Sequence, residues 1–199
     1  MIENPLAKKL KDYNIVLGSG SPRRQQFFKE LGLRFEVRVK SIDEYYPEHL
    51  KGAEIPDFLA KAKAHALLDT LSEKEILVTS DTVVWHKGRS LEKAANKEEA
   101  FAMLKTLSND WHEVITSVCF STIEEQKLVN HTTHVKLAKL DDDEITYYIE
   151  YFKPFDKAGA YGIQEWIGLI GIEEIKGAYT NVVGLPTQLV YKTLTDMVS

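Results

Sequence analysis

Cysteine is almost absent from this 199-residue chain, which contains Cys119 alone. One cysteine excludes an internal disulfide and a metal site built on several thiolates, and it is typical of a reducing compartment. Because Cys119 lies in an apolar run without a neighbouring base, we expect a buried thiol. Apolar runs of membrane-spanning length are missing, and residues 1–12 lack the apolar core of a signal peptide. These absences predict a cytoplasmic protein.

An excess of basic residues is missing as well. Lysine and arginine number 25 against 30 aspartates and glutamates, which gives a formal net charge of −5. A broadly cationic surface for nucleic acid is therefore not expected, although a local basic cleft is compatible with this balance. A zinc site is not expected either, because His131 and His134 lie three residues apart on a predicted strand and so face opposite sides.

Apolar strands alternate with amphipathic helices along the chain, which is typical of an α/β protein. No repeat, low-complexity tract or long linker divides the sequence, so we expect residues 1–199 to form one compact domain with two lobes. The predicted strands are 14–17, 35–39, 75–85, 114–123 and 128–140. The predicted helices are 22–31, 56–71, 97–107, a segment capped by Asp141 and ended by Pro154, and a last helix from Pro186.

The segment 17–24 predicts a strand end, a Gly/Ser turn and a helix start. Ser21 is a suitable N-cap and Pro22 fits the first helical position. Arg23 and Arg24 then lie at the positive end of the helix dipole, an arrangement suited to binding an anion such as phosphate. The segment matches neither the P-loop nor the dinucleotide-binding pattern. A plain strand–turn–helix connection with surface arginines is the alternative.

Three further features are candidates for chemistry. Asp81 interrupts an apolar run, and we expect it at a strand end, either in a cleft where it holds Mg²⁺ or orients a water, or in a tight turn. Lys63 lies in the apolar column of a helix, from which lysine ordinarily reaches toward solvent. The loop 156–164 contains two glycines that allow close approach to a ligand. The amide of Gln164 both donates and accepts, and so could read a base edge.

Taken in order, these segments resemble the Maf family of nucleoside triphosphate pyrophosphatases. The matching blocks span nearly the whole chain and are 17–24, 43–44, 63–64, 80–84, 91–93, 156–164 and 179–186. The resemblance implies a Maf/ITPase-like α/β fold, in which an elongated mixed sheet is flanked by helices and two lobes enclose a central cleft. It implies hydrolysis of a nucleoside triphosphate to the monophosphate and pyrophosphate with Mg²⁺ or Mn²⁺. The intact loop through Gln164 implies the branch that acts on dTTP and UTP, whether normal or modified, and family analogy suggests a homodimer.

The resemblance also implies roles for particular residues. Asp81 matches the catalytic proton acceptor, and Arg23, Thr82 and Gln164 match positions that select the substrate. The positions that bind phosphate are Ser21, Arg24, Lys63, Lys93 and Lys157. Glu44 and Asp81 are the expected metal ligands, so two roles compete for Asp81.

The chain departs from the family pattern at two positions. Ala94 stands where proline usually follows the lysine, and Glu165 stands where glycine usually follows the glutamine. The second departure places a carboxylate beside the residue expected to read the base. The alternative hypothesis for the whole chain is a non-catalytic regulatory module that binds a nucleotide or nucleic acid and is linked to cell division.

Overall fold

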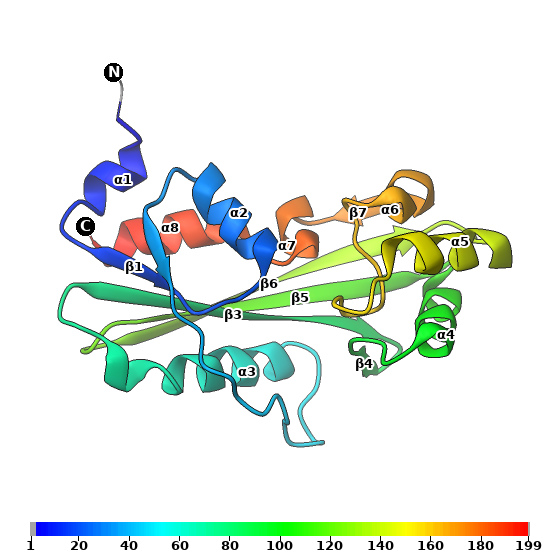
Figure 1. The fold of residues 1–199 in the computed structure, drawn as a ribbon, viewed down its shortest axis with the longest axis horizontal. Coiled ribbons are helices and arrows are strands. Elements are labelled where there is room, and N and C mark those ends of the chain that lie inside the picture. The colour runs from blue at the N-terminus through cyan, green and yellow to red at the C-terminus, as the bar shows by residue number, and fades with distance from the viewer. Residues whose placement is uncertain (1–2, 199) are drawn as a thin grey trace.

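The computed structural model describes residues 3–198, and a seven-stranded mixed sheet forms its centre (Figure 1). The strand order is β2-β1-β3-β5-β6-β7, with β4 paired to β3. The strands are β1 (Asn14–Leu17), β2 (Phe35–Val37), β3 (Glu75–His86), β4 (Arg89–Leu91), β5 (Trp111–Ser121), β6 (Gln126–Leu137) and β7 (Ile172–Lys176). β1 runs parallel to both of its neighbours, and the other pairs are antiparallel. The 12-residue strand β3 alone extends for about 40 Å, so the predicted elongated mixed sheet is confirmed.

Helices flank both faces of this sheet, as predicted. They are α1 (Pro5–Lys9), α2 (Pro22–Glu30), α3 (Glu54–His65), α4 (Lys97–Leu107), α5 (Asp142–Phe152), α6 (Trp166–Gly171), α7 (Tyr179–Val183) and α8 (Thr187–Met197), with a short 3-10 helix at Leu68–Thr70. Figure 1 shows α3 on one face, and α2, α7 and α8 on the other. The fold is therefore of the mixed α/β class.

Alternate residues of the central strands build separate apolar cores. Leu17 and Val78 belong to the core that includes residues of α1, α2 and α8. Val16 and Leu77 point to the opposite face and pack with residues of α3. A further core, centred on residues such as Leu104, joins α4 and α5 to the far end of the long strands. Successive residues of the inner strands are apolar because both faces of the sheet are covered.

Strand β3 has an edge that is left open in the middle of its length. Along this edge it pairs with β1 up to Val78 and with β4 from Val84 onward. No described strand pairs with residues 79–83 on this side, whereas β5 pairs with β3 continuously on the other, with Asp81 opposite Ser117. Asp81 thus lies inside a strand, so its expected place at a strand end or in a tight turn is wrong. The strand continues through the polar position of Asp81 because β3 stays paired with β5 there.

Local sequence signals locate several element boundaries. Ser21 caps α2 with Pro22 at its first position, and Pro154 follows the end of α5. Helix α3 begins at Glu54 and ends at His65, so it starts earlier and stops sooner than the predicted 56–71. Proline is tolerated within a first helical turn, so Pro56 does not mark the start. The short elements α1, β4, α6, β7 and α7 were not predicted, since a few residues give little periodicity.

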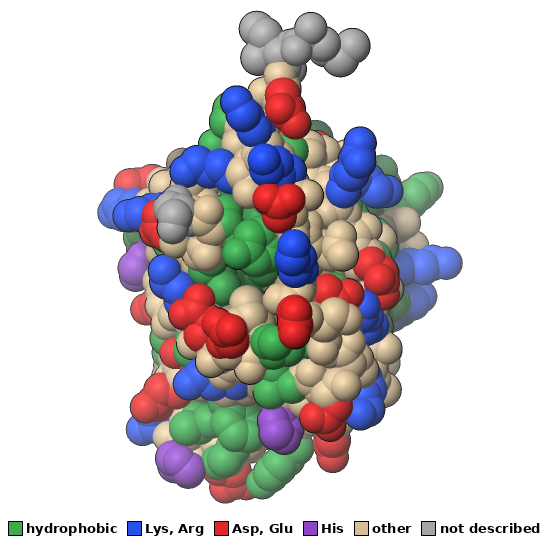
Figure 2. All heavy atoms as spheres, turned by 90° about the vertical axis from the view of Figure 1, so that its left-hand side faces the viewer, with side chains coloured by type: hydrophobic (Ala, Val, Ile, Leu, Met, Phe, Trp, Pro, Cys, Tyr) green, Lys and Arg blue, Asp and Glu red, His purple; other side chains and the backbone are tan. Residues whose placement is uncertain are grey.

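The surface carries both signs of charge. Figure 2 shows acidic and basic side chains intermingled over the end of the molecule that bears α1.

Within residues 3–198, no helix combines the length and apolar character needed to cross a membrane. Cys119 is buried, as expected.

Candidate active site

A cavity of about 730 Å³ opens at the unpaired stretch of β3. Its walls come from the turn before α2, the segment 39–46, helix α3, the strands β3 and β4, and the loop 156–164. All ten residues that the sequence singles out line it: Ser21, Arg23, Arg24, Glu44, Lys63, Asp81, Thr82, Lys93, Lys157 and Gln164. Segments far apart in the chain thus converge on one cavity.

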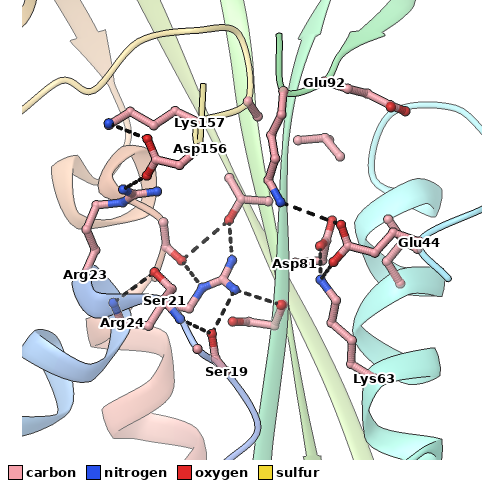
Figure 3. Close-up of a pocket in the computed structure, with 18 of the residues that line it drawn as sticks. Ser19, Ser21, Arg23, Arg24, Glu44, Lys63, Asp81, Glu92, Asp156 and Lys157 are labelled. Atoms are coloured by element: carbon pink, nitrogen blue, oxygen red, sulfur yellow. Dashed lines mark hydrogen bonds and ion pairs between the residues drawn. The ribbon is translucent and has the colours of Figure 1, made fainter. Parts of the chain in front are cut away.

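Two carboxylates share one ammonium group on the α3 side of this cavity (Figure 3). The Lys63 Nζ atom lies 2.6 Å from Asp81 Oδ1 and 2.7 Å from Glu44 Oε1. Lys63 therefore does not extend freely into solvent, which would be the ordinary behaviour of a lysine on an apolar helix face; only 18% of its side chain is exposed. The two carboxylates are close enough together to share a cation.

The two carboxylates differ in their electrostatic surroundings. Burial raises the pKa of Asp81 above its usual value, although the ammonium of Lys63 acts in the opposite direction. Partial burial of Glu44 also favours its neutral form, but Lys63 and Lys93 outweigh this effect and lower the pKa of Glu44. Asp81 is thus the more easily protonated member of the pair.

The Arg24 side chain reaches the open edge of β3 from α2, which lies on the face of the sheet opposite α3 (Figure 1). Its Nε donates to Gly184 O at 2.9 Å, and its Nη1 donates to Ser80 O at 3.0 Å and more weakly to Ser19 Oγ at 3.4 Å. Its Nη2 donates to Thr82 Oγ1 at 3.0 Å. The guanidinium therefore holds together the turn before α2, the open edge of β3 and the end of α7.

Thr82 and Asp81 are presented to opposite sides of β3 because successive side chains of a strand alternate. The Thr82 hydroxyl accepts from Arg24 and shares a hydrogen bond of 2.9 Å with Thr116 Oγ1. Asp81 points to α3, where it meets Lys63. The gap between β1 and β4 lets side chains from both faces of the sheet line the same cavity.

Arg23 points away from Arg24 and toward the loop 156–164 (Figure 3). Its Nη1 lies 2.8 Å from Asp156 Oδ2, and the other oxygen of Asp156 lies 2.7 Å from Lys157 Nζ. The Lys157 side chain is only 9% exposed and also pairs with Glu165 Oε1 at 3.0 Å. The two adjacent arginines thus have different partners and different environments.

The remaining predicted residues, Lys93 and Gln164, also line the cavity. Lys93 forms an isolated antiparallel bridge with Ala158, and its Nζ lies 3.8 Å from Glu44. Ala94, which replaces the usual proline, is buried in the core beside α4, so this segment is held without that ring. Gln164 is exposed, lies directly before α6 and lines the cavity.

Sequence reasoning missed several polar residues of this region. Asp156 was seen only as part of a loop, yet it joins Arg23 to Lys157. Tyr148 is buried in α5, and its hydroxyl donates to Glu165. Ser80 Oγ is buried beside the cavity and has no hydrogen-bond partner within residues 3–198. The contacts of Asp156 with Arg23 and of Tyr148 with Glu165 join segments that are distant in the sequence, so no local pattern indicates them.

Known proteins are similar to this chain over nearly its whole length. A dTTP/UTP pyrophosphatase of Flavobacterium johnsoniae is 56% identical over 193 residues, covering 97% of this chain and 100% of that protein. One of Bacteroides fragilis is 47% identical over 189 residues, covering 94% and 98%. The crystal structure of a nucleoside-triphosphatase / dITP/XTP pyrophosphatase from Mycobacterium abscessus covers 90% of this chain and 92% of its own, with a TM-score of 0.43 and 15% identity. The family model described as "Maf-like protein" matches residues 14–197, and the chain belongs to the Maf family.

Proposed function

We propose that this protein hydrolyses dTTP and UTP, normal or modified, to the nucleoside monophosphate and pyrophosphate. The observation that carries the proposal is the placement of Asp81 and Glu44 around Lys63 in a cavity that is also lined by the start of α2, with Arg23 and Arg24, and by Lys93 and Lys157. The relatives at 56% and 47% identity are named dTTP/UTP pyrophosphatases, which supports both the reaction class and the choice of pyrimidine nucleotides.

The triphosphate would be bound between the start of α2 and the cationic side chains around the cavity. A triphosphate carries about four negative charges, so its binding depends mainly on positioning and charge neutralisation. At the N-terminus of α2, Pro22 has no N–H and the N–H of Arg24 is capped by Ser21 Oγ, so the backbone N–H of Arg23 is the one offered to phosphate; the Arg23, Lys93 and Lys157 side chains line the same cavity. Arg24 uses four contacts to hold the protein, which leaves one of its five N–H groups for a phosphate oxygen.

Asp81 would accept the proton of the attacking water. The water oxygen attacks the α-phosphorus, the bond from that phosphorus to the oxygen bridging it to the β-phosphorus breaks, and pyrophosphate departs with the bridging oxygen and the bond's electron pair. Burial raises the pKa of Asp81, which makes its carboxylate a better proton acceptor than an exposed one. We propose that Arg23, Thr82 and Gln164 determine which nucleotide is used.

The residues present fit a divalent cation bound together with the substrate. Glu44 and Asp81 supply hard oxygen donors, and their contacts with Lys63 place both beside one positive charge. Within residues 3–198, no group of three or more histidine, cysteine or acidic side chains is arranged to hold a metal. A pair of carboxylates suits Mg²⁺ or Mn²⁺, because such an ion is commonly held by one or two carboxylates plus substrate phosphates. Such an ion would neutralise phosphate charge and polarise the attacked phosphoryl group.

Removal of divalent metal is therefore expected to abolish turnover. With excess EDTA, the rate of pyrophosphate release from dTTP should fall by at least about a hundredfold. Adding Mg²⁺ or Mn²⁺ in excess of the chelator should restore it. Full activity in EDTA would contradict the metal assignment while leaving the hydrolytic reaction intact.

A nucleotide panel tests the proposed function itself. The protein is incubated with dTTP, UTP, dCTP, dATP and dGTP plus Mg²⁺ or Mn²⁺, and pyrophosphate is measured separately from orthophosphate. Pyrophosphate from dTTP and UTP is the expected result. Orthophosphate in place of pyrophosphate would overturn the bond assignment, and no product from any nucleotide would favour the non-catalytic binding module.

A further inference from the structure

Glu165 belongs to a network that spans the cavity wall, which we call the loop network: Arg23, Asp156, Lys157, Glu165 and Tyr148. One Glu165 oxygen pairs with Lys157 Nζ at 3.0 Å, and the other accepts from the Tyr148 hydroxyl. The Tyr148 oxygen in turn accepts the backbone N–H of Gly162 at 3.0 Å. Helix α5 is thereby tied to the loop two residues before Gln164.

The position of Glu165 invites another interpretation, which the geometry does not support. Glu165 is the N-cap residue of α6, but its side chain makes no capping hydrogen bond. Its carboxylate is instead turned inward, with 19% of the side chain exposed and both oxygens bonded to protein groups. The carboxylate is therefore not free to contact the base or to repel phosphate.

Charge balance gives Glu165 a specific task. Lys157 is almost fully buried, and an ammonium in that position needs compensating charge. Asp156 provides part of it but is shared with Arg23. The loop network holds two cations and two anions, so loss of Glu165 would leave one positive charge in excess.

Glu165 is also in contact with the segment that carries Gln164. A Cβ atom placed on Gly162 would lie 2.9 Å from Gln164 Nε2 and 2.9 Å from Glu165 Cδ. Both side chains therefore lie against the same glycine, and a change in one alters the packing surface of the other. The structure thus connects the carboxylate to the side chain expected to select the nucleotide.

We propose that Glu165 is a positioning residue for nucleotide selection: through Lys157 and Tyr148 it fixes the loop 156–164 and so places Gln164 in the cavity. Its role in selection rests on the proposed function, whereas its hold on the loop does not. The resemblance to the Maf family implies glycine at this position, and glycine has no side chain for these contacts. The contacts of Glu165 with Lys157 and Tyr148 therefore fix the loop of this chain in a way that a glycine could not.

Two variants and one control test the proposal. Glu165→Gln removes the charge but keeps the shape, and Glu165→Gly restores the residue usual in the family. Glu150→Gln is the matched control, because Glu150 of α5 pairs with Lys97 at 2.6 Å through half-exposed side chains. In the nucleotide-free protein, amide hydrogen exchange across residues 156–168 should accelerate by about threefold to tenfold in both Glu165 variants and stay unchanged in the control.

Kinetics then separate positioning from catalysis. The ratio of kcat/KM for dTTP to that for dCTP or dGTP should fall by about threefold to tenfold in the Glu165 variants, mainly through KM for dTTP. The kcat for dTTP should change by less than about twofold. Unchanged hydrogen exchange would overturn the positioning role, and faster exchange with unchanged discrimination would overturn the role in selection. If the wild-type protein hydrolyses no nucleotide, the proposed function fails, but exchange in the variants still decides whether Glu165 fixes the loop.

Discussion

Replacing Asp81 with asparagine is expected to lower the turnover of dTTP by roughly a hundredfold to ten-thousandfold. Asparagine keeps the size of the side chain but cannot accept a proton or offer an anionic ligand. Both roles considered for Asp81 are lost together, so the effect should appear in kcat rather than in nucleotide affinity alone. Pyrophosphate release under saturating dTTP, with Mg²⁺ or Mn²⁺ present, measures the change.

The same variant should not lose stability. Burial raises the pKa of Asp81 in the folded protein, so the neutral form is favoured by folding and ionisation opposes it. The stabilising contribution of this group is therefore present below the unfolded-state pKa and is lost as the pH rises through the folded-state pKa. The asparagine side chain of the variant stays neutral at every pH. In EDTA near pH 7, the variant should melt at the wild-type temperature or above it, and the difference should vanish in acid.

A matched control is available on the same side of the molecule. Asp69 lies in the 3-10 helix after α3 and is exposed, so Asp69→Asn should leave both turnover and melting temperature unchanged. Retention of more than about a tenth of wild-type turnover by Asp81→Asn would contradict its role in the reaction. A large fall in melting temperature would instead indicate that Asp81 mainly holds Lys63 in place.

Sequence reasoning succeeded where one short segment contains the whole physical cause. The N-cap Ser21 and the following Pro22 define the start of α2 through bonds within one turn, and Pro154 stops α5 for a similarly local reason. The long strands were found because several consecutive apolar residues are needed where both sheet faces are covered. Such elements need no knowledge of their neighbours in space.

The site depends on pairings between distant segments, and these set the limit of prediction. Asp81 was expected at a strand end or in a tight turn because the open edge between β1 and β4 cannot be seen in its own segment. Lys63 looked like an ordinary surface lysine, since its partners lie 18 and 19 residues away in the sequence. The family resemblance named these residues in advance. The structure adds the electrostatic surroundings of each charged group, and it shows that some of these residues also stabilise the fold.

Arg24 and Arg23 offer the sharpest test of that distinction, because identical substitutions at adjacent positions should differ strongly. Arg24→Lys should lower the free energy of unfolding by about 3 kcal/mol, which corresponds to about 6–12 °C in melting temperature for a protein of this size. One ammonium cannot reproduce the planar fork that reaches Gly184 O, Ser80 O and Thr82 Oγ1. Buried acceptors left without donors account for the loss.

Arg23→Lys is the matched control and should cost less than about 1 kcal/mol. The Arg23 side chain is 30% exposed and pairs with one carboxylate, that of Asp156, whose side chain is 58% exposed. A lysine can keep that charge pair. Thermal unfolding in the absence of nucleotide measures both variants. Equal losses would show that the contacts of Arg24 do not hold the open edge of β3, and Arg24 would then act on phosphate alone. A loss of stability in Arg24→Lys alone would mean that the Arg24 guanidinium stabilises the cavity wall as well as facing the substrate. A fall in the turnover of Arg24→Lys could then be assigned to phosphate binding only together with the stability measurement.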